Sequence, residues 1–424
     1  MYKAPRGTFD ILPEEQSYWT YVEQKAVSLC HLYGYQPLTT PIIEDAQIFT
    51  KAVASGTDIV DKEMYVFKDR SGQELALRAE GTAPVCRAYL EHGLFNLPQP
   101  VKLYYMGPAF RYERPQSGRY RQHHQFGFEA LGEADPALDA EVIQMARQFF
   151  HSLGITRLSI QLNSIGCSLC RPGYLQVLRE HYSGYLETVC SDCNTRLGRN
   201  PLRVLDCKQA SCQEIAVTAP KISDYLCLEC QSHFRSVQKY LEAMDIPFQL
   251  NPRLVRGLDY YTRTVFEIEP GEKGGQSTLG GGGRYDDLIE ELGGKPTPAV
   301  GFAAGLERII LNLKKQKPDI PALPGPEVYI SCLEEAAKIE AMRTAAELRT
   351  AGIAAITATG DKSLKSQLRQ ANSLGIAHVL IIGKEEISRR SVTFRDMSSG
   401  EQKTIPLSEI VTALLSRVKS GTNP

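Results

Sequence analysis

The stretch "PAFRYERPQSGRYRQHHQFGFEALG", residues 108–132, decides the fold of this chain. Strand-forming residues at its two ends flank a polar loop rich in arginine, and this pattern predicts an antiparallel hairpin. Arg111 and Glu113 lie two residues apart at the end of the first strand, so both side chains are expected on one face. The loop carries three further arginines, Arg114, Arg119 and Arg121. Such a loop suits a cationic flap over a polyphosphate.

The return strand of this hairpin places Gln125, Gly127 and Glu129 on one face by the same period of two. That face combines an amide, a glycine gap and a carboxylate, which is typical of a binding site. The alternative is a solvated hairpin whose ion pairs contribute little. A solvated face has no need of Gly127, because glycine weakens strand pairing.

A second stretch, "LVRGLDYYTRTVFE" at residues 254–267, places Arg256 among strand-forming apolar residues. A buried guanidinium is costly unless an anion meets it. That anion is either an internal carboxylate such as Asp259 or a bound carboxylate or phosphate. These residues alone leave both interpretations open.

Two strand-to-helix transitions carry further candidates. In "LALRAEGTAPVCRAYL", residues 75–90, Thr82 is the predicted N-cap of a helix. Glu80 then lies beside the helix N-terminus, where it can receive an ammonium while the amides bind an anion. In "GFAAGLERI", residues 301–309, Arg308 lies one turn into a helix. The alternatives are an ordinary helix start in the first case and a surface arginine in the second.

Composition predicts a soluble globular protein of two or three domains. The chain has 424 residues, of which 42% are hydrophobic and 23% charged, and its formal net charge is −1. Any contact with nucleic acid must therefore use local basic patches. There is no apolar signal segment and no run of eighteen apolar residues, which excludes a signal peptide and a membrane span. Eleven cysteines without a secretion signal indicate a reducing compartment, so we expect a cytoplasmic location.

Patterning along the chain predicts an α+β protein of three parts. Residues 1–322 form the largest domain, with a mainly antiparallel sheet. Residues 165–240 are expected to be a helical, Cys-rich insertion within it, because strand patterns resume afterwards. A Pro-rich linker then precedes residues 326–424, where strands alternate with helices. This alternation predicts a small, mainly parallel α/β domain.

Eight of the cysteines fall within the insertion and suit a structural zinc site. They are Cys167, Cys170, Cys190, Cys193, Cys207, Cys212, Cys227 and Cys230. The first two C-x-x-C pairs alone have the spacing of a zinc ribbon, and the other four cysteines can complete a second site. Free thiols and disulfides are the alternatives. Cys30, Cys86 and Cys332 are interpreted as buried apolar residues.

Taken together and in order, these stretches resemble the class II aminoacyl-tRNA synthetases, and among them the histidyl-tRNA synthetase family. "GYQPLTTPIIE" at residues 34–44, "FRYERPQSGRYRQHHQFGFE" and "GFAAGLER" are similar to the three class II motifs. "RGLDYYTRTVFE", "LRAEGTA" and "GGGRYDDL" are similar to the histidine-specific stretches. One departure is Ala79, where the family usually has proline. The resemblance covers essentially the whole chain and implies a class II catalytic domain followed by an anticodon-binding domain.

The resemblance also implies the reaction and its residues. Histidine and ATP, with Mg²⁺, give histidyl-adenylate and pyrophosphate, and histidine then passes to tRNA(His). Arg111, Arg256 and Arg308 are the implied catalytic residues, and the implied ATP-binding residues are Arg111, Glu113, Arg119 and Arg308. The implied histidine-binding residues are Glu80, Gly81, Thr82, Arg111, Gln125, Glu129, Arg256, Tyr260 and Tyr261. A homodimer formed through the first motif is implied as well.

Two rival functions belong to other classes. One is the catalytically inactive paralogue that regulates ATP phosphoribosyltransferase, and the other is a tRNA-binding module without catalysis. The paralogue lacks the anticodon domain and loses pocket residues, whereas this chain retains Arg111, Arg256 and a full domain after residue 325. Retention of the whole set of phosphate-facing arginines argues against the second rival.

Overall fold

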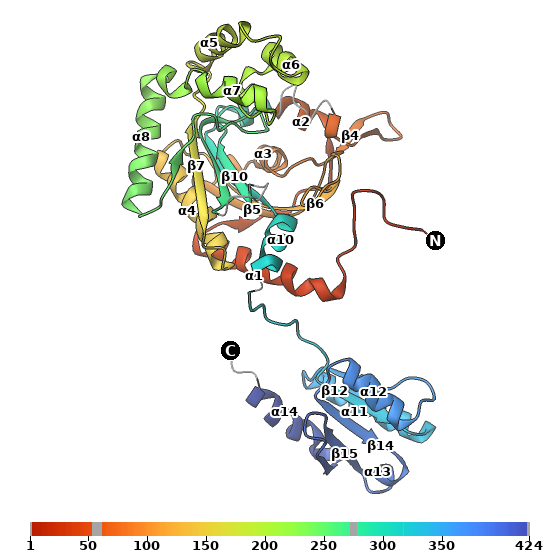
Figure 1. Ribbon diagram of the computed structural model, residues 1–424. Coiled ribbons are helices and arrows are strands. Elements are labelled where there is room, and N and C mark those ends of the chain that lie inside the picture. The colour runs from red at the N-terminus through yellow and green to blue at the C-terminus, as the bar shows by residue number, and fades with distance from the viewer. Residues whose placement is uncertain (1, 53–61, 272–277, 317, 422–424) are drawn as a thin grey trace. The chain divides into compact units, whose positions relative to one another are not determined.

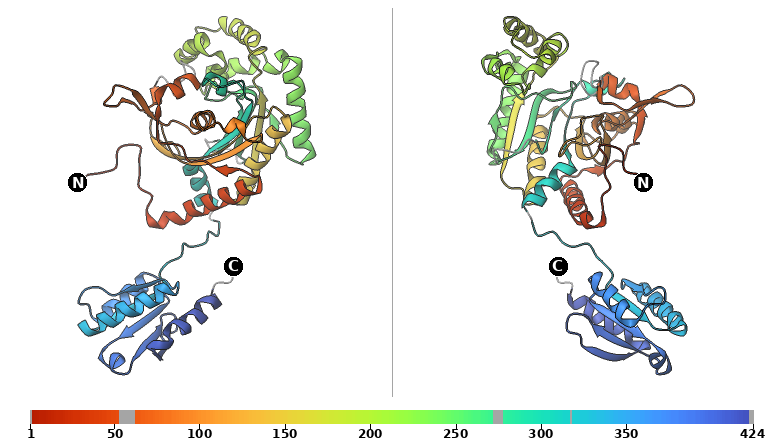
Figure 2. Two further views of the ribbon diagram at one scale, coloured as in Figure 1. Left: turned by 180° about the vertical axis from the view of Figure 1, so that it is seen from behind. Right: turned by 45° about the vertical axis from the view of Figure 1, so that its right-hand side comes forward.

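The computed structural model describes residues 2–52, 62–271, 278–316 and 318–421. The chain divides into two compact units, Met1–Pro321 and Ala322–Pro424, and each is described by itself (Figures 1 and 2). Within the described residues, no helix is both long and apolar enough to cross a membrane.

An eight-stranded sheet forms the centre of the first unit, in the order β1-β5-β6-β11-β10-β9-β7-β8. Its inner pairs are all antiparallel, and only the outer pairs β1–β5 and β7–β8 are parallel. The predicted antiparallel sheet is therefore confirmed. The strands are β1 (Gln36–Pro37), β5 (Val101–Phe110), β6 (Gln122–Leu131), β7 (Leu158–Ser164), β8 (Gln249–Leu250), β9 (Thr262–Pro270), β10 (Gly280–Arg284) and β11 (Ala299–Gly305).

Helices cover both faces of this sheet, because side chains of alternate strand residues point to opposite sides. Phe126 and Phe128 of β6 join one hydrophobic core, which also takes residues of α1 (Gln16–Leu32), α4 (Pro136–Ser152) and α10 (Leu306–Gln316). The residues that alternate with these phenylalanines, such as Gln125 and Glu129, face the other side of the sheet, where α3 (Thr82–Glu91) lies (Figure 1). The sheet thus presents one apolar face and one face with polar groups.

A small sheet and two short helices lie beside α3. Its order is β2-β4-β3, formed by β2 (Ile43–Asp45), β3 (Val66–Lys68) and β4 (Glu74–Leu77). The stretch EMYVFKDRSGQELALR predicts a hairpin with a turn at residues 69–72. The β3–β4 hairpin indeed turns there, where the Gly72 N–H donates to the Asp69 carbonyl at 3.1 Å. The helices are α2 (Ala46–Ala52) and α9 (Leu288–Glu291).

The segment between β7 and β8 is helical and Cys-rich. Its helices are α5 (Arg171–Ser183), α6 (Ser191–Arg199), α7 (Ala210–Thr218) and α8 (Leu228–Ala243). α8 packs along α4 beside the sheet, while α5, α6 and α7 gather at one end of the unit (Figures 1 and 2).

The second unit holds a five-stranded sheet in the order β13-β12-β14-β15-β16. The β13–β12 and β12–β14 pairs are parallel, whereas β14–β15 and β15–β16 are antiparallel. The stretches VYISCL, IAAITA and HVLIIG predict three strands, and all three are confirmed. The antiparallel hairpin that follows them was not predicted. The elements are β12 (Val328–Cys332), α11 (Glu335–Thr350), β13 (Ala355–Thr357), α12 (Leu364–Ser373), β14 (His378–Ile382), α13 (Lys384–Ser388), β15 (Ser391–Asp396), β16 (Gln402–Pro406) and α14 (Ile410–Gly421).

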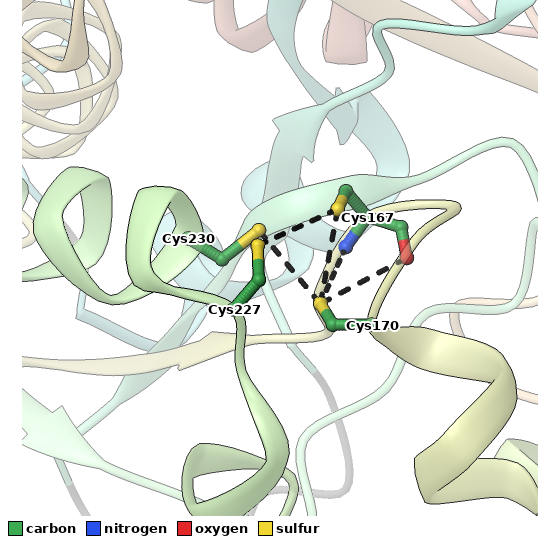
Figure 3. Close-up of side chains that lie close together, drawn as sticks. All are labelled: Cys167, Cys170, Cys227 and Cys230. Carbon is green, nitrogen blue, oxygen red and sulfur yellow. Dashed lines mark hydrogen bonds between the residues drawn. The ribbon is translucent and has the colours of Figure 1, made fainter.

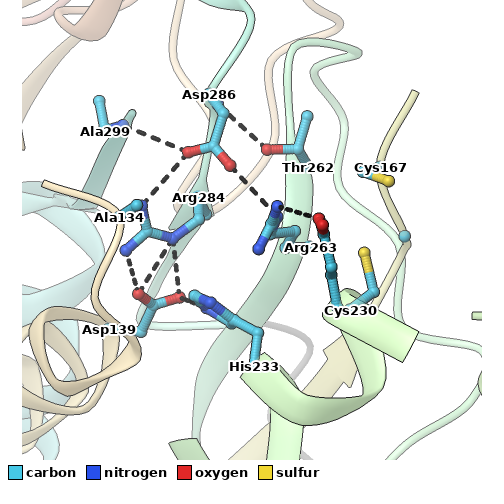
Figure 4. A network of polar contacts seen from close by, with 12 residues as sticks. Ala134, Asp139, Cys167, Cys230, His233, Thr262, Arg263, Arg284, Asp286 and Ala299 are labelled. Atoms are coloured by element: carbon cyan, nitrogen blue, oxygen red, sulfur yellow. Dashed lines mark hydrogen bonds and ion pairs between the residues drawn. The ribbon is translucent and has the colours of Figure 1, made fainter. Parts of the chain in front are cut away.

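A buried ion pair ties β10 to α4 in the first unit. Arg284 is 0% exposed and Asp139 is 1% exposed. The Arg284 guanidinium donates to the Asp139 carboxylate and to Asp286 at 3.2 Å, and His233 of α8 lies 3.1 Å from Asp139 (Figure 4). Burial alone would raise the pKa of Asp139, but the charge of Arg284 and the hydrogen bonds from His233 and Arg284 together outweigh burial and hold this pKa at about 2.

We expect this pair to make the first unit acid-sensitive. Because the pKa of Asp139 is lower in the folded state than its usual value of 3.8, the stabilisation is present above about pH 4 and is lost as the pH falls towards 2. The difference corresponds to about 2 kcal/mol of unfolding free energy. Denaturant unfolding followed by Trp19 fluorescence measures it, because Trp19 is the chain's one tryptophan and is buried in α1. The difference in unfolding free energy between the wild type and Asp139→Asn should shrink as the pH falls from about 4 towards 2. A difference that stays constant over this range would contradict the expectation.

Candidate active site

A polar cavity of about 320 Å³ opens over the sheet face that carries Gln125 and Glu129. Residues from β6, β10, β11, the start of α3 and α10 line it. Of the residues predicted for histidine, ATP or catalysis, those lining it are Glu80, Thr82, Arg111, Glu113, Arg119, Gln125, Glu129, Arg256, Tyr260, Tyr261 and Arg308. Gly81 lies behind this lining, where an added Cβ would fall 2.1 Å from the Tyr105 ring.

A wider hollow of about 1080 Å³ lies elsewhere in the unit, between α2, α3 and the loop at residues 292–298. None of the residues predicted for histidine or ATP, all of which the structure describes, lines it. The volume of a cavity therefore does not identify the candidate active site, whereas the convergence of charged side chains does.

Three arginines from distant segments meet at the polar cavity. Arg111 follows β5, Arg256 precedes β9 and Arg308 lies in the first turn of α10. The Arg111 Nε–H donates to the Ala79 carbonyl at 3.0 Å, and Arg308 donates to the carbonyls of Gly118 at 3.0 Å and of Thr278 at 3.1 Å. Carbonyl oxygens orient the guanidinium groups without neutralising their charge.

The electrostatics of this arginine group favour an anion. Burial lowers the pKa of Arg308, and the positive charges of Arg119 and Arg111 lower it further. Like charges held together in a partly buried site repel one another, so a bound anion relieves the repulsion.

Arg256 has an internal partner, but it is not Asp259. The Arg256 Nη1 donates to Glu267 of β9, while Asp259 accepts from the Asn200 side chain at 2.5 Å. Asp259 is thus the wrong partner, because the turn after residue 256 directs it towards the helical insertion. The Arg256 Nε is buried without a hydrogen-bond partner among the described residues. The guanidinium passes over the glycine strand β10, where a Cβ on Gly281 would lie 2.6 Å from Nη1.

The hairpin around the cavity differs slightly from its predicted form. β5 ends at Phe110, and the Arg111 N–H makes one more cross-strand bond, to the Arg121 carbonyl at 2.9 Å. Glu113 therefore lies beyond the strand, yet it still faces the cavity, 3.5 Å from the Arg119 guanidinium.

A buried carboxylate, Glu129, forms the inner end of the cavity. It accepts hydrogen bonds from the Thr82 hydroxyl at 2.8 Å and from the Tyr285 hydroxyl at 2.5 Å. Burial raises the pKa of Glu129 to about 8. A Cβ on Gly301 would lie 1.6 Å from the Glu129 carboxylate, so glycine is required beneath it.

Glu80, rather than Thr82, caps helix α3. Its carboxylate accepts from the backbone N–H of Thr82 at 2.6 Å and of Ala83 at 2.8 Å. Thr82 is the first residue of the helix, so the predicted N-cap is wrong. The Thr82 hydroxyl bonds Glu129 instead, because the carboxylate of Glu80 satisfies the free N–H groups of the first turn.

Aromatic rings form a wall of the cavity. The Tyr260 ring centroid lies 4.7 Å from that of Tyr261 and 5.6 Å from that of Tyr285. Gln125 faces them from β6, and its side-chain oxygen is buried without a hydrogen-bond partner among the described residues. Gly127 leaves room for Tyr105, whose hydroxyl would lie 2.3 Å from an added Cβ. The cavity therefore pairs an aromatic wall with polar groups that await a ligand.

Sequence reasoning missed several residues at this site, among them His123, Glu267, Thr278 and Tyr285. His123 shares the face of Gln125 and Glu129, so the same period of two could have identified it. Burial, followed by the charge of Arg111, lowers the pKa of His123 to about 3, and its ring is neutral at pH 7. Tyr285 lies in the stretch GGGRYDDL, which could have marked it, but only the tertiary structure shows that it meets Glu129.

The eight cysteines of the insertion lie in two groups of four. One group is Cys167, Cys170, Cys227 and Cys230, whose sulfur atoms point towards one another in Figure 3, and the other is Cys190, Cys193, Cys207 and Cys212. The predicted ribbon of the first two C-x-x-C pairs is therefore wrong. Helix α5 carries the chain away between these pairs, and α8 brings the last pair back to the first.

Comparison with known proteins identifies the family. A family model described as histidyl-tRNA synthetase matches residues 7–168 and 208–309, and a model of the anticodon binding domain matches residues 327–417. The chain belongs to the histidyl-tRNA synthetase family. The histidine–tRNA ligase of Dehalococcoides mccartyi is 56% identical to it over 411 residues, which cover 97% of this chain and 98% of that protein.

Solved structures of histidyl-tRNA synthetases share its fold. The apo S. aureus histidyl-tRNA synthetase is 36% identical, with a TM-score of 0.82, and the match covers 97% of this chain and 99% of that one. A Bacillus halodurans C protein, titled as an ATP phosphoribosyltransferase regulatory subunit/histidyl-tRNA synthetase, is 21% identical with a TM-score of 0.64. That match covers 90% of this chain and 98% of the other, and it shows the fold alone.

Proposed function

We infer that this histidyl-tRNA synthetase family member forms histidyl-adenylate in the polar cavity and transfers histidine to tRNA(His). The known reaction of the family is this ATP-dependent ligation, which releases pyrophosphate and AMP. One observation carries the assignment of the site: three arginines from distant segments face one cavity whose inner end is lined by carboxylate, amide and tyrosine groups.

The arginine group is the proposed phosphate side. The histidine carboxylate attacks the α-phosphorus of ATP, a new P–O bond forms, and the bond to pyrophosphate breaks. Two anions must approach and negative charge grows on the phosphate oxygens, so fixed positive charge lowers the barrier. In our proposal, Arg256 and Arg111 bind the carboxylate and the α-phosphate, and Arg308 binds the distal phosphates.

Glu113 and Arg119 complete the proposed ATP site from the hairpin loop. The carboxylates of Glu113 and Glu267 at this side are hard oxygen donors of the kind that Mg²⁺ accepts. They suit the Mg²⁺ that accompanies ATP, which neutralises phosphate charge when bound.

The inner end is the proposed histidine side. Glu80 and Gln125 are assigned to the ammonium, and Thr82, beside them, is assigned to the substrate backbone. Gly81 is assigned to the histidine side through its packing, because it leaves room for the Tyr105 ring behind the start of α3. Glu129 accepts an imidazole N–H, and Tyr260 and Tyr261 form the wall against the ring. Because these buried polar groups stay unpaired with an apolar amino acid, we expect strong rejection of such substrates.

Domain roles, assembly and location complete the proposal. We assign catalysis to residues 1–322, with the Cys-rich insertion at 165–240, and recognition of the tRNA to residues 326–424. A homodimer formed through residues 34–44 and a cytoplasmic location are part of the same proposal, supported by the family and by the first class II motif.

A purely regulatory role is the rival, and the cavity argues against it. An inactive binding protein has no use for a charged phosphate side, yet Arg111, Arg256 and Arg308 all face the cavity.

The deciding experiment is ATP–pyrophosphate exchange by the purified chain. We expect exchange that depends on histidine, with no exchange for the other amino acids, followed by histidine transfer to tRNA(His). Absence of exchange, with histidine still bound in calorimetry, would favour the regulatory rival.

A further inference from the structure

The cysteine group at the base of the insertion has the geometry of a metal site. Cys167 and Cys170 lie between β7 and α5, and Cys227 and Cys230 lie at the start of α8, 60 residues further along. The Sγ–Sγ distances are 3.8 Å for Cys167–Cys170, 3.9 Å for Cys167–Cys227 and 3.9 Å for Cys170–Cys230 (Figure 3). A tetrahedron of sulfurs about 2.3 Å from a zinc ion has edges of about 3.8 Å.

Two helix N-termini converge on these sulfurs. Cys170 and Cys227 are the N-cap residues of α5 and α8, and neither helix has a side-chain cap. The positive ends of two helix dipoles therefore meet at the sulfur group. The Cys167 N–H also donates to the Cys170 sulfur at 3.3 Å. All four cysteines are free, at separations far beyond a disulfide bond of about 2.05 Å.

The second cysteine group repeats this arrangement further out in the insertion. Its ligand atoms also lie within 4.8 Å of one another, with 3.8 Å between the sulfurs of Cys190 and Cys207. The Cys190 N–H donates to the Cys212 sulfur at 3.3 Å, and Cys190 is the N-cap of α6. Two groups built alike argue against accidental packing of thiols.

The first group is joined directly to the tyrosine wall of the cavity. Arg171, the residue after Cys170, donates to the carbonyls of Ile165 at 3.1 Å, Gly166 at 3.0 Å and Tyr261 at 2.6 Å. The Arg171 guanidinium thus fixes the first cysteine turn, residues 167–170, to the backbone of Tyr261.

The second cysteine turn of the same group, residues 227–230, contacts Arg263 at the start of β9. Glu229, between Cys227 and Cys230, lies 3.7 Å from the Arg263 guanidinium, which also lies 3.5 Å from Asp286 (Figure 4). Arg263 has a φ of +50°, a left-handed conformation that costs about 1 kcal/mol or more in a non-glycine residue. Its N–H donates to the Gly166 carbonyl at 2.8 Å. Contacts from both cysteine turns therefore hold the start of β9.

We propose that Cys167, Cys170, Cys227 and Cys230 bind a structural zinc ion that positions the Tyr260–Tyr261 wall, and that Cys190, Cys193, Cys207 and Cys212 bind a second. Each ion takes four thiolates and displaces their four protons to solvent. The positioning role rests on the proposed function, whereas zinc binding itself does not. Arg171 and Arg263 are positioning residues in this account.

Metal analysis of the full chain, purified under reducing conditions, tests zinc binding. We expect two zinc ions per chain, one ion in Cys230→Ser and in Cys193→Ser, and two in the matched control Cys332→Ser, whose thiol lies outside both groups. Cobalt substitution should give the absorption of tetrahedral cobalt thiolate, which reports ligands even where a serine variant folds poorly. Zinc-free protein that binds no added zinc or cobalt would overturn the proposal, as would disulfides within the groups after purification without oxidant.

Steady-state kinetics test the positioning role. Loss of the first zinc in Cys230→Ser, or of both ions with a chelator, should raise the KM for histidine on the order of tenfold, while the KM for ATP stays near wild type. Arg171→Met should raise the histidine KM similarly with the zinc count unchanged, and added zinc should reverse the effect of the chelator. An unchanged histidine KM in the zinc-depleted enzyme would refute positioning but leave the proposed function intact.

Discussion

Arg256→Gln is expected to lower histidine-dependent ATP–pyrophosphate exchange by about 10²–10³-fold, the loss typical of a fixed group that stabilises transition-state charge. Arg256 is the arginine that lies beside both Glu267 and the tyrosine wall. Glutamine keeps a hydrogen-bond donor and removes the charge, so the loss should fall mainly on kcat. Exchange kinetics with varied ATP and histidine measure it.

The matched control is Arg253→Gln, because Arg253 lies three residues away and is exposed. It should exchange at the wild-type rate. Arg256→Lys should recover only part of the loss, since an ammonium keeps the charge but not the planar fork. Exchange by Arg256→Gln at more than a tenth of the wild-type rate would contradict a role in the chemical step.

The second large effect is expected for Glu129→Ala, which should raise the KM for histidine about 100-fold and leave the KM for ATP near wild type. The variant removes the proposed acceptor for the imidazole and leaves the hydroxyls of Thr82 and Tyr285 without their partner. An unsatisfied buried polar group costs about 1–3 kcal/mol. Histidine titrations in the exchange assay measure the change.

Glu129→Gln separates an effect on histidine binding from an effect on folding, because glutamine keeps the shape of the side chain and one acceptor oxygen. It should fold like the wild type and still bind histidine more weakly. Glu74→Ala, at an exposed strand position, is the control and should change neither KM. An unchanged histidine KM in Glu129→Ala would refute the assignment of the inner end of the cavity to histidine.

Local signals predicted several parts of this structure well. The stretch SLKSQLRQANSLG predicts a helix capped by Ser363 and stopped at Gly375. In the structure the Ser363 hydroxyl accepts the Ser366 N–H at the start of α12, and the chain leaves the helix through Gly375 at a φ of +67°. The alternation of β6 placed Gln125 and Glu129 together on a face opposite Phe126 and Phe128. Such features depend on neighbouring residues, so the sequence carries their signal.

The sequence carries no signal for which charged side chain pairs with which. Arg256 pairs with Glu267 in β9, while Asp259, which is nearer in the sequence, bonds Asn200 of the insertion. The C-terminal hairpin of β15 and β16 was missed although Val392 and Phe394 alternate along β15, because β16 is an exposed edge strand without an apolar run.

By itself the sequence determined the helices and strands with a strong periodicity, the polar face of β6 and the family, because periodicity and ordered motifs are written in neighbouring residues. Only the tertiary structure decided which groups meet: Arg111, Arg256 and Arg308 at one cavity, Tyr285 on Glu129, and each cysteine in its group of four. The physical reason is that sheet register and helix packing set distances between side chains far apart in the chain, and no spacing along the sequence encodes those distances.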